Sequence, residues 1–422
     1  MRLLSFIAIV CISVLIISNT SPVMGFNLSI TNSKNHVANW TVMLYLDGDN
    51  DLENIIIEKV INNLELAGSD GNINIIAQFD AHIYFKGVKR YYITYDTSND
   101  IISDVVDFLN EKNMGDPDTL YDFVTWACEN YPAEHYYLSL FDHGNGWRPP
   151  FLKDETNHDT LTLNELKNAM NDIKKRINKK IDVVSFDACL MGMLEVFYQI
   201  RDTVDVVVGS EDVIYGNGLP YHMILHELKK NPHMNSESLA KKIIDEYYSY
   251  YHSHFPMAMG AFKLENLTKK VVEKTLDVFA SYLYENFSEF ETEIREAIDH
   301  TRAYNVETYI THYKDVYDFA YEISNRIEDE KIKKNALELI NEIKNCTIYE
   351  KENNKKDSHG ISIYLPVSKK DYDSSYKELD ICKNTNWDAF ISKCLNKKYI
   401  SPSIYDIKPA LLKRFIEKIS CF

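Results

Sequence analysis

Short apolar runs alternate with amphipathic stretches along the first half of the chain. The apolar runs are rich in β-branched and aromatic residues and are bounded by Asp, Gly or Asn, which is typical of buried strands. They occupy residues 41–46, 73–79, 90–95, 136–141, 181–186 and 204–209. Apolar residues at helical spacing predict helices at 51–66, 118–130, 164–179 and 190–200. This alternation predicts a mainly parallel sheet that is covered by helices on both faces.

The second half of the chain has a different pattern. Residues 264–354 are helical in pattern and heavily charged, and the polar run 350–357 is expected to form an exposed loop. The segment HGISIYLP at 359–366 predicts one more strand, which we expect to return to the sheet.

The chain starts with a targeting segment. Met1-Arg2 is followed by an apolar run, 3–17, and by a polar stretch that ends at Val23-Met24-Gly25. Small residues at the −3 and −1 positions predict a cleaved signal peptide. The run of about 15 residues is shorter than the roughly 20 that cross a bilayer, although a retained membrane anchor is the alternative. We therefore expect a secreted or extracytoplasmic, membrane-anchored protein.

Charge and cysteine spacing exclude several classes of function. The net charge of −17 repels phosphate backbones, so we expect no nucleic-acid partner. The seven cysteines contain no CxxC pair, which excludes zinc ribbons and thioredoxin-like redox sites. In an exported protein, disulfides remain possible among Cys346, Cys382, Cys394 and Cys421.

Two predicted strands end in residues that carry chemistry. The strand at 136–141 runs into Asp142-His143-Gly144, and the strand at 181–186 runs into Asp187-Ala188-Cys189. Ligands bind outside the carboxyl ends of parallel strands, so both loops should lie at one functional edge. A thiolate is a strong nucleophile, and an imidazole can generate it and then protonate a leaving amine.

Backbone groups could complete such a site. The N–H groups of Gly144 and Cys189 are candidates for an oxyanion hole, and a helix that starts near Leu190 would favour the thiolate. Taken alone, a cysteine after an apolar run is usually a small buried hydrophobe. Together, His143 and Cys189 are 46 residues apart, close to the spacing of about 50 in caspase-type enzymes.

Several motifs occur together in one order. They are WTVMLYLDGDNDLE (40–53), NYPAEHYYLSLFDHGNGW (130–147), VVSFDACLMGMLEV (183–196) and GSEDVIYGNGLPY (209–221), followed by YKDVYDFA (313–320), HGISIYLP and TNWDAF. The chain thereby resembles the clostripain family of cysteine peptidases, in the caspase-like clan.

The resemblance implies a caspase-like α/β/α sandwich with a mainly parallel sheet, a helical insertion and a later strand. The expected parts are a signal peptide or anchor at 1–25, a caspase-like catalytic core at 38–262, a mainly helical region at 263–357, a returning strand with the C-terminal part of the peptidase domain at 358–396, and a tail at 397–422.

The resemblance also implies a reaction. We expect a secreted cysteine endopeptidase that acts on protein or peptide substrates through a thioester acyl-enzyme, with Cys189 as nucleophile and His143 as general base. Cleavage after Arg or Lys is implied, and the candidate substrate-binding residues are Asp187, Glu211, Asp212 and Asn217. A peptidase with a non-basic P1 preference and a non-catalytic binding protein are the alternatives.

Two departures from the family's pattern weaken a strict arginine preference. Arginine-cleaving relatives often have an acid near position 217, where this chain has Asn217, and Leu219 replaces a common Trp. A buried guanidinium favours a charged partner. Asp187 could instead cap a helix or orient the cysteine loop, and Glu211 could be structural.

The resemblance further implies that the precursor is cut between the histidine and cysteine motifs. The polar segment 148–160 carries two prolines and is expected to be an exposed loop. Arg148 and Lys153 are candidate cleavage sites, and 174–176 and 179–180 are alternatives.

The expected chemistry requires no metal or organic cofactor. A calcium ion is possible at Asp154, Glu155 and Asp159, although such loop carboxylates are usually just solvated. The run 47–51 partly imitates a calcium loop, but Leu52 stands where that loop needs glycine, which favours a strand end and a helix cap.

Overall fold

The computed structural model describes residues 37–84, 86–253, 255–304 and 312–396. The predicted signal peptide or anchor and the C-terminal tail lie outside the described residues. Within the described ranges, no helix is both long and apolar enough to cross a bilayer.

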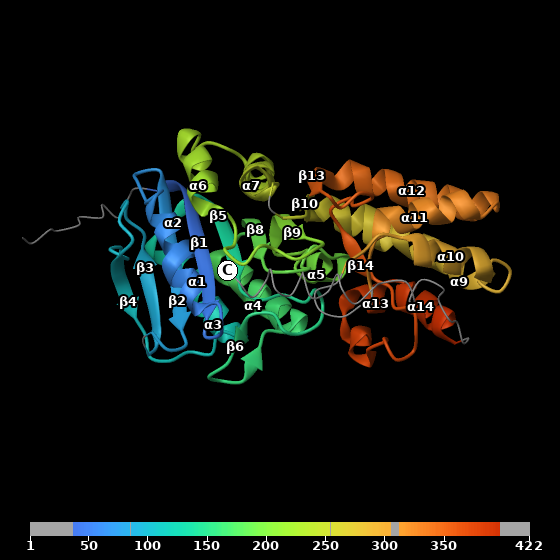
Figure 1. The fold of residues 1–422 in the computed structure, drawn as a ribbon, viewed down its shortest axis with the longest axis horizontal. Helices are drawn as coiled ribbons and strands as arrows, with labels where there is room; N and C mark the ends of the chain where they lie inside the picture. The colour runs from blue at the N-terminus through green and yellow to red at the C-terminus, as the bar shows by residue number, and fades with distance from the viewer. Residues whose placement is uncertain (1–36, 85, 254, 305–311, 397–422) are drawn as a thin grey trace, which may run out of the picture. The chain divides into compact units, whose positions relative to one another are not determined.

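A nine-stranded sheet forms the centre of the fold, in the order β13-β10-β9-β8-β5-β1-β2-β3-β4 (Figure 1). The five strands from β9 to β2 are parallel, and the strands beyond them at both edges are antiparallel. The strands are β1 (Ala38–Gly48), β2 (Ile73–Ala81), β3 (Val88–Tyr92), β4 (Asp104–Phe108), β5 (Ala133–Phe141), β8 (Ile181–Asp187), β9 (Val204–Ser210), β10 (Met257–Lys263) and β13 (Thr347–Asn353).

Helices cover both faces of this sheet, because successive residues of the central strands are apolar and point to opposite faces. In β1, Met43 and Tyr45 face a core shared with α3 and α4, whereas Val42 and Leu44 face a second core. The second core is shared with the helical segment 53–65 and with α6 and α7. The helices are α1 (Glu53–Ile55), a π-helical turn (Ile56–Ile61), α2 (Asn62–Glu65), α3 (Pro117–Asn130), α4 (Leu163–Ile177), α5 (Leu194–Gln199), α6 (Tyr221–Lys230) and α7 (Ser236–Tyr251). The predicted α/β/α sandwich is confirmed.

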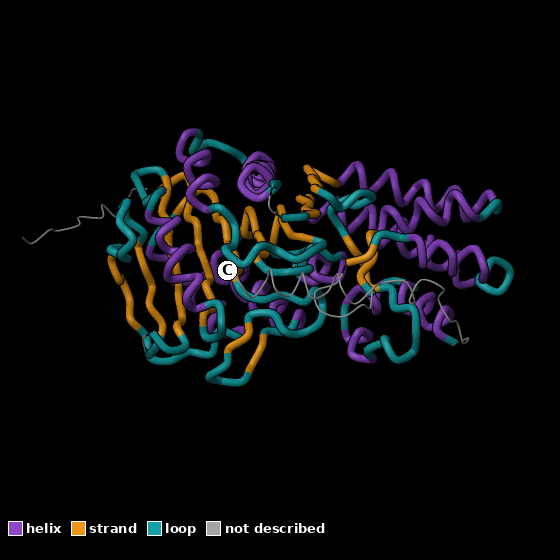
Figure 2. The backbone as a smooth tube through the Cα atoms, viewed as in Figure 1, coloured by secondary structure: helices purple, strands orange, loops and turns teal. Residues whose placement is uncertain are grey.

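The C-terminal half adds a helical region and two small sheets. Figure 2 shows its helices gathered at the β10–β13 end of the main sheet. They are α8 (Leu264–Asn266), a π-helix (Leu267–Leu276), α9 (Asp277–Asn286), α10 (Glu291–His300), α11 (Val316–Arg326), α12 (Glu330–Cys346), a 3-10 turn (Ser374–Glu378), α13 (Asp380–Asn384) and α14 (Trp387–Leu395). The small sheets contain β11 (Ala303–Tyr304), β12 (Tyr313–Asp315) and β14 (Ser362–Tyr364), and β6 (Lys153–Asp154) and β7 (Asp159–Thr160).

The later strand that joins the main sheet is not the predicted one. Residues 362–364 form β14, which pairs with β12 in the three-stranded sheet. The returning strand is β13, which includes the start of the predicted loop at 350–357. Its charged residues do not match the apolar pattern of a buried strand, but an edge strand tolerates such side chains.

The predicted helix at 190–200 is also too long. Leu190 has a φ of +64°, a left-handed conformation that ends any regular helix. The amide of Gly192 donates to the carbonyl of Ser210 at 2.7 Å, which ties the segment to β9. The helix α5 therefore begins only at Leu194.

Candidate active site

The two predicted loops start side by side. Strands β5 and β8 are parallel and in register, with Phe141 opposite Asp187. The amide of Asp142 donates to the carbonyl of Asp187 at 3.4 Å. His143 and Cys189 each follow two residues after this last pair, so they leave the same edge of the sheet.

Gly144 brings the two loops into contact. A Cβ atom at this position would lie 2.4 Å from the carbonyl oxygen and 2.8 Å from the nitrogen of Cys189, closer than real Cβ atoms come to backbone. Only glycine permits this approach. In the part of the chain that the structure describes, the amide N–H groups of Gly144 and Cys189 have no hydrogen-bond partner.

The Cys189 thiol is in a site that favours its neutral form. Its Sγ accepts a hydrogen bond from the amide of Ile214 at 3.4 Å. Burial nevertheless raises the pKa of Cys189 to about 11, and the negative charges of Asp212, Asp187 and Asp142 add to this effect. Because α5 begins at Leu194, the expected helix terminus does not lie beside the sulfur, and that argument for a resting thiolate is wrong.

His143 is paired with a carboxylate that sequence reasoning missed. Its Nε2 lies 2.7 Å from Oδ1 of Asp51, and both side chains are largely accessible to solvent. Burial alone would raise the pKa of Asp51, but the hydrogen bond and charge of His143 lower it. The rule for parallel strands also indicates Asp51, because this residue follows β1, which is parallel to β5 and ends at the same edge.

A buried carboxyl group supports the histidine loop from behind. Oδ1 of Asp142 accepts from Nδ2 of Asn50 at 2.8 Å, and Oδ2 accepts from the amide of Lys153 at 2.5 Å. Burial raises the pKa of Asp142 to about 7. Asp142 thus links two segments: the loop that contains Asp51, and the β6–β7 hairpin.

Asp187 holds the turn that follows β9 instead of capping a helix. Its Oδ2 accepts from the amide of Leu219 at 2.8 Å and from the Tyr221 hydroxyl at 2.7 Å. Burial raises the pKa of Asp187 to about 6. Gly218, with a φ of +72°, lets the turn pass against this carboxyl group.

The other predicted substrate-binding residues have different surroundings. Glu211 is buried and accepts from the amide of Gly360 at 2.8 Å. Asp212 is buried and forms an ion pair with Lys355, so both acids already have partners. Asn217 is half-buried, on the turn that Asp187 holds.

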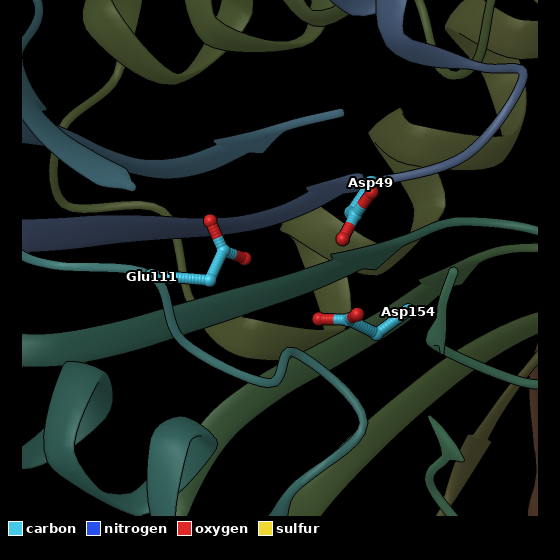
Figure 3. A group of neighbouring side chains, drawn as sticks. All are labelled: Asp49, Glu111 and Asp154. Atoms are coloured by element: carbon cyan, nitrogen blue, oxygen red, sulfur yellow. The ribbon is translucent and has the colours of Figure 1, made fainter. Parts of the chain in front are cut away.

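The calcium candidates are not brought together. Glu155 Oε1 lies 2.7 Å from the ammonium of Lys153, and Oδ2 of Asp159 accepts from Asn113 at 2.6 Å. Asp154 instead lies near Asp49 and Glu111 (Figure 3).

Two other features of the sequence have structural explanations. His359 stacks on Tyr317 with ring centroids 3.8 Å apart, so its ring packs within the C-terminal half of the fold. Cys346, Cys382 and Cys394 are free thiols, and Cys421 lies outside the described residues.

Comparisons with known proteins agree on one family. The sequence profile of the clostripain family matches residues 44–394. Clostripain from Hathewaya histolytica is 26% identical over 421 positions, which cover 83% of this chain and 79% of clostripain.

Two solved structures share the fold. A secreted C11 cysteine protease from Bacteroides thetaiotaomicron, in complex with an irreversible peptide inhibitor, has a TM-score of 0.64 and 20% identity, over 83% of this chain and all of that chain. An inactive zymogen C11 protease from Parabacteroides distasonis has a TM-score of 0.61 and 20% identity, over 83% of this chain and 98% of that chain. Since the family profile spans most of the chain and the fold agrees, this chain belongs to the clostripain family and is a clostripain-like cysteine endopeptidase.

Proposed function

We propose that Cys189 is the nucleophile and His143 the general base of this endopeptidase. The contact between Gly144 and the Cys189 backbone carries the proposal, because it brings the histidine and cysteine loops together at one sheet edge. His143 takes the thiol proton as Cys189 attacks the scissile carbonyl of a bound peptide. The imidazolium then protonates the leaving amine, and water hydrolyses the thioester.

The raised pKa of Cys189 sets the order of these steps. The thiol is neutral at rest, so the proton moves to His143 only as the substrate carbonyl is attacked. Asp51 fixes one ring nitrogen of His143 and stabilises the imidazolium that forms. Asp51 is therefore a positioning residue in this proposal.

The unpaired amide groups of Gly144 and Cys189 form the oxyanion hole in this proposal. Both N–H groups belong to the backbone at the contact of the two loops, so they are fixed before the substrate arrives. Preorganised donors of this kind typically contribute about 10²–10³ in rate.

We further propose that the enzyme cleaves after Lys or Arg. The carbonyl of Asp212 accepts a hydrogen bond from the amide of Leu190 at 3.1 Å, so Asp212 lies beside the cysteine loop and is the acid we favour as the partner of a P1 side chain. Its present partner, Lys355, has a side chain that is 26% exposed. A substrate ammonium or guanidinium group would replace Lys355 at this carboxylate.

A panel of fluorogenic peptides that differ only at P1 tests the reaction and the preference together. We expect the wild type to hydrolyse Lys and Arg peptides and the Cys189→Ala variant to hydrolyse none. Turnover of other P1 residues with none of Lys or Arg would contradict the basic preference. No turnover of any peptide by protein that has been shown to be folded and processed would favour a binding protein.

We also propose that the chain cuts itself in the segment 148–160. Lys153 has a side chain 43% exposed, whereas the Arg148 guanidinium donates to the Tyr364 hydroxyl and to the carbonyl of Asp371. Residues 174–176 lie within α4, and a helix cannot enter an extended peptide-binding cleft. Lys153 is therefore the candidate we favour.

Intact-mass analysis tests self-processing. We expect the wild type to give two fragments, cut after Lys153, and Cys189→Ala to give a single uncut chain. The Lys153→Gln variant should lose that junction, whereas the matched change Lys180→Gln should keep it. A wild-type chain that is uncut and fully active would contradict the proposal.

Finally, we propose that the protein is secreted. The signal-like residues 1–25 support this, and a relative with the same fold is described as a secreted protease. The N-terminal sequence of the protein in the culture medium would test it, with Phe26 expected as the first residue.

A further inference from the structure

Two large apolar side chains are exposed at the tip of the β2–β3 hairpin. Ile83 is 81% and Tyr84 is 70% exposed, the two highest values for large apolar residues in the part of the chain that the structure describes. Turns usually carry small or polar residues. Two adjacent apolar side chains on a turn therefore indicate a surface that contacts another molecule.

The loop that follows β1 holds this tip in place. The amides of Ile83 and Tyr84 both donate to Oε1 of Glu53, at 2.9 and 2.5 Å, and Glu53 is buried. The residue before them, His82, pairs with Asp49. The two apolar side chains are thus presented by a fixed backbone, which reduces the entropy that is lost when they bind a ligand.

The tip lies at the same edge of the sheet as the proposed catalytic residues. Figure 1 shows β8, β5, β1 and β2 in this order across the sheet, and they are parallel. One residue from each strand forms a level row: Asp187, Phe141, Leu46 and Phe79. The segments that leave the edge beyond this row contain, in the same order, Cys189, His143, Asp51 and Ile83.

This order places the tip on one side of the cleaved bond. In the proposed reaction the imidazole of His143 protonates the leaving amine, so the substrate residues after the cleaved bond begin beside His143. The tip lies beyond His143, on the side away from Cys189. Strands β5 and β2 are two strand spacings apart, about 10 Å, a distance that an extended peptide spans in about three residues.

We propose that Ile83 and Tyr84 bind an apolar side chain of the substrate at the third or fourth residue after the cleaved bond (P3′ or P4′). A leucine or an aromatic residue would bury apolar surface against the tip, whereas a small polar residue would gain little there. The inference rests on the proposed roles of His143 and Cys189, and it adds a preference for residues that follow the cleaved bond.

Internally quenched peptides test the inference. Each contains the P1 residue that the wild type cleaves fastest, followed by five residues, with Leu or Ser at P3′ in one pair and at P4′ in another. We expect the wild type to have a kcat/KM about 10-fold higher with Leu than with Ser in at least one pair. In the double variant Ile83→Ser/Tyr84→Ser, this ratio should fall to about twofold or less. Because the ratio compares two substrates on one enzyme, a general loss of activity cancels.

Two further variants separate binding from a structural effect. Ile83→Leu/Tyr84→Phe preserves the apolar surface and should keep the preference for Leu. Tyr95→Ser removes another exposed aromatic side chain, and it should keep the preference as well. Tyr95 follows β3, which is antiparallel to β2 and therefore ends at the opposite edge of the sheet.

The inference is wrong if the wild type does not prefer Leu in either pair, if Ile83→Ser/Tyr84→Ser keeps the preference, or if Tyr95→Ser loses it. A short substrate with a fluorogenic leaving group directly after P1 measures the reaction without P3′ and P4′. Cleavage of this short substrate with no preference among the long peptides would overturn the inference alone. No cleavage of either kind by folded, processed wild type would overturn the proposed function, and the inference with it.

Discussion

Cys189 and His143 are held by different kinds of contact. The half-buried thiol receives one backbone hydrogen bond, from Ile214, and the charges of nearby acids act on it. The imidazole is accessible and is bound by a single carboxylate, that of Asp51. The proposed nucleophile is therefore held by the backbone, whereas the proposed base is held by a carboxylate on a surface loop. This asymmetry gives two predictions at the residue scale.

The reactivity of the resting thiol should increase with pH far into the alkaline range. Burial raises the pKa of Cys189 to about 11, so the thiolate fraction grows about tenfold per pH unit below that value. We expect the rate of alkylation of the unprocessed chain by iodoacetamide to rise steadily between pH 7 and pH 9.5, after subtraction of the rate for Cys189→Ala. A plateau below pH 8 would show that the thiolate is already present at rest.

Replacement of Gly144 by alanine should abolish most activity without unfolding the protein. The new Cβ would overlap the backbone of Cys189, so both proposed oxyanion donors must move. We expect kcat/KM to fall by about 100-fold or more. The matched control is Gly216→Ala, where the nearest atom to the new Cβ is 3.7 Å away. Near-normal kcat/KM in Gly144→Ala would argue against the oxyanion hole.

Elements differ in how well the sequence predicts them. Strand residues 41–46, 136–141 and 181–186 all lie within observed strands, because a two-sided core demands continuous apolar runs. The helix predicted at 190–200 begins too early, since hydrophobic spacing does not reveal a left-handed residue such as Leu190. The strand β13 was missed because its edge position relaxes the demand for apolar residues.

The candidate site was predictable only in part. The loops of His143 and Cys189 follow from the rule for parallel strands, and that rule extends to Asp51. The surroundings of the acids do not follow from the sequence. Asp212 meets Lys355 and Glu211 meets Gly360 across more than 140 residues, contacts that no local pattern specifies.

Helix α5 contains a buried acid that should make stability depend on pH. Glu195 accepts from the amide of Tyr364 at 2.8 Å and from the Tyr376 hydroxyl at 2.7 Å. Burial raises its pKa from 4.5 to about 7, so the folded state holds a proton that the unfolded state releases. The contribution of this group is fully favourable below pH 4.5 and is lost as pH rises toward 7.

The Glu195→Gln variant tests this prediction. Glutamine keeps an acceptor oxygen for both donors and carries no charge to bury. We expect its free energy of unfolding at pH 8 to exceed that of the wild type by roughly 2 kcal/mol, with little difference at pH 4.5. Urea titrations at the two pH values measure the difference. A variant that is less stable than the wild type at pH 8 would show that the carboxylate itself is needed.

The C-terminal half of the molecule supports the segment next to the proposed nucleophile. Two contacts join the segment after β9 to the C-terminal half. The amide of Gly360 donates to Glu211, and Lys355 pairs with Asp212. Strand β13 adds to the same sheet through β10. The C-terminal half is therefore part of the peptidase unit, and changes in it should be transmitted to Cys189.

Removal of Lys355 tests this connection. In Lys355→Met, the buried carboxylate of Asp212 loses its partner, and we expect a loss of stability of roughly 3 kcal/mol. The double variant Asp212→Asn/Lys355→Met should recover much of that loss, because no unpaired charge remains. Thermal unfolding with both variants measures the coupling. Equal stability of the single and double variants would show that the unpaired carboxylate of Asp212 has no cost.

We propose that one thiol among the five described free cysteines, Cys189, performs the chemistry with the help of His143. A chloromethyl ketone peptide with lysine at P1, followed by mass-spectrometric mapping, tests it most directly. We predict a single adduct on Cys189 in the wild type and in Cys382→Ala, and almost none in His143→Ala. An adduct on another cysteine, or full labelling of Cys189 without His143, would contradict the proposed roles of these two residues.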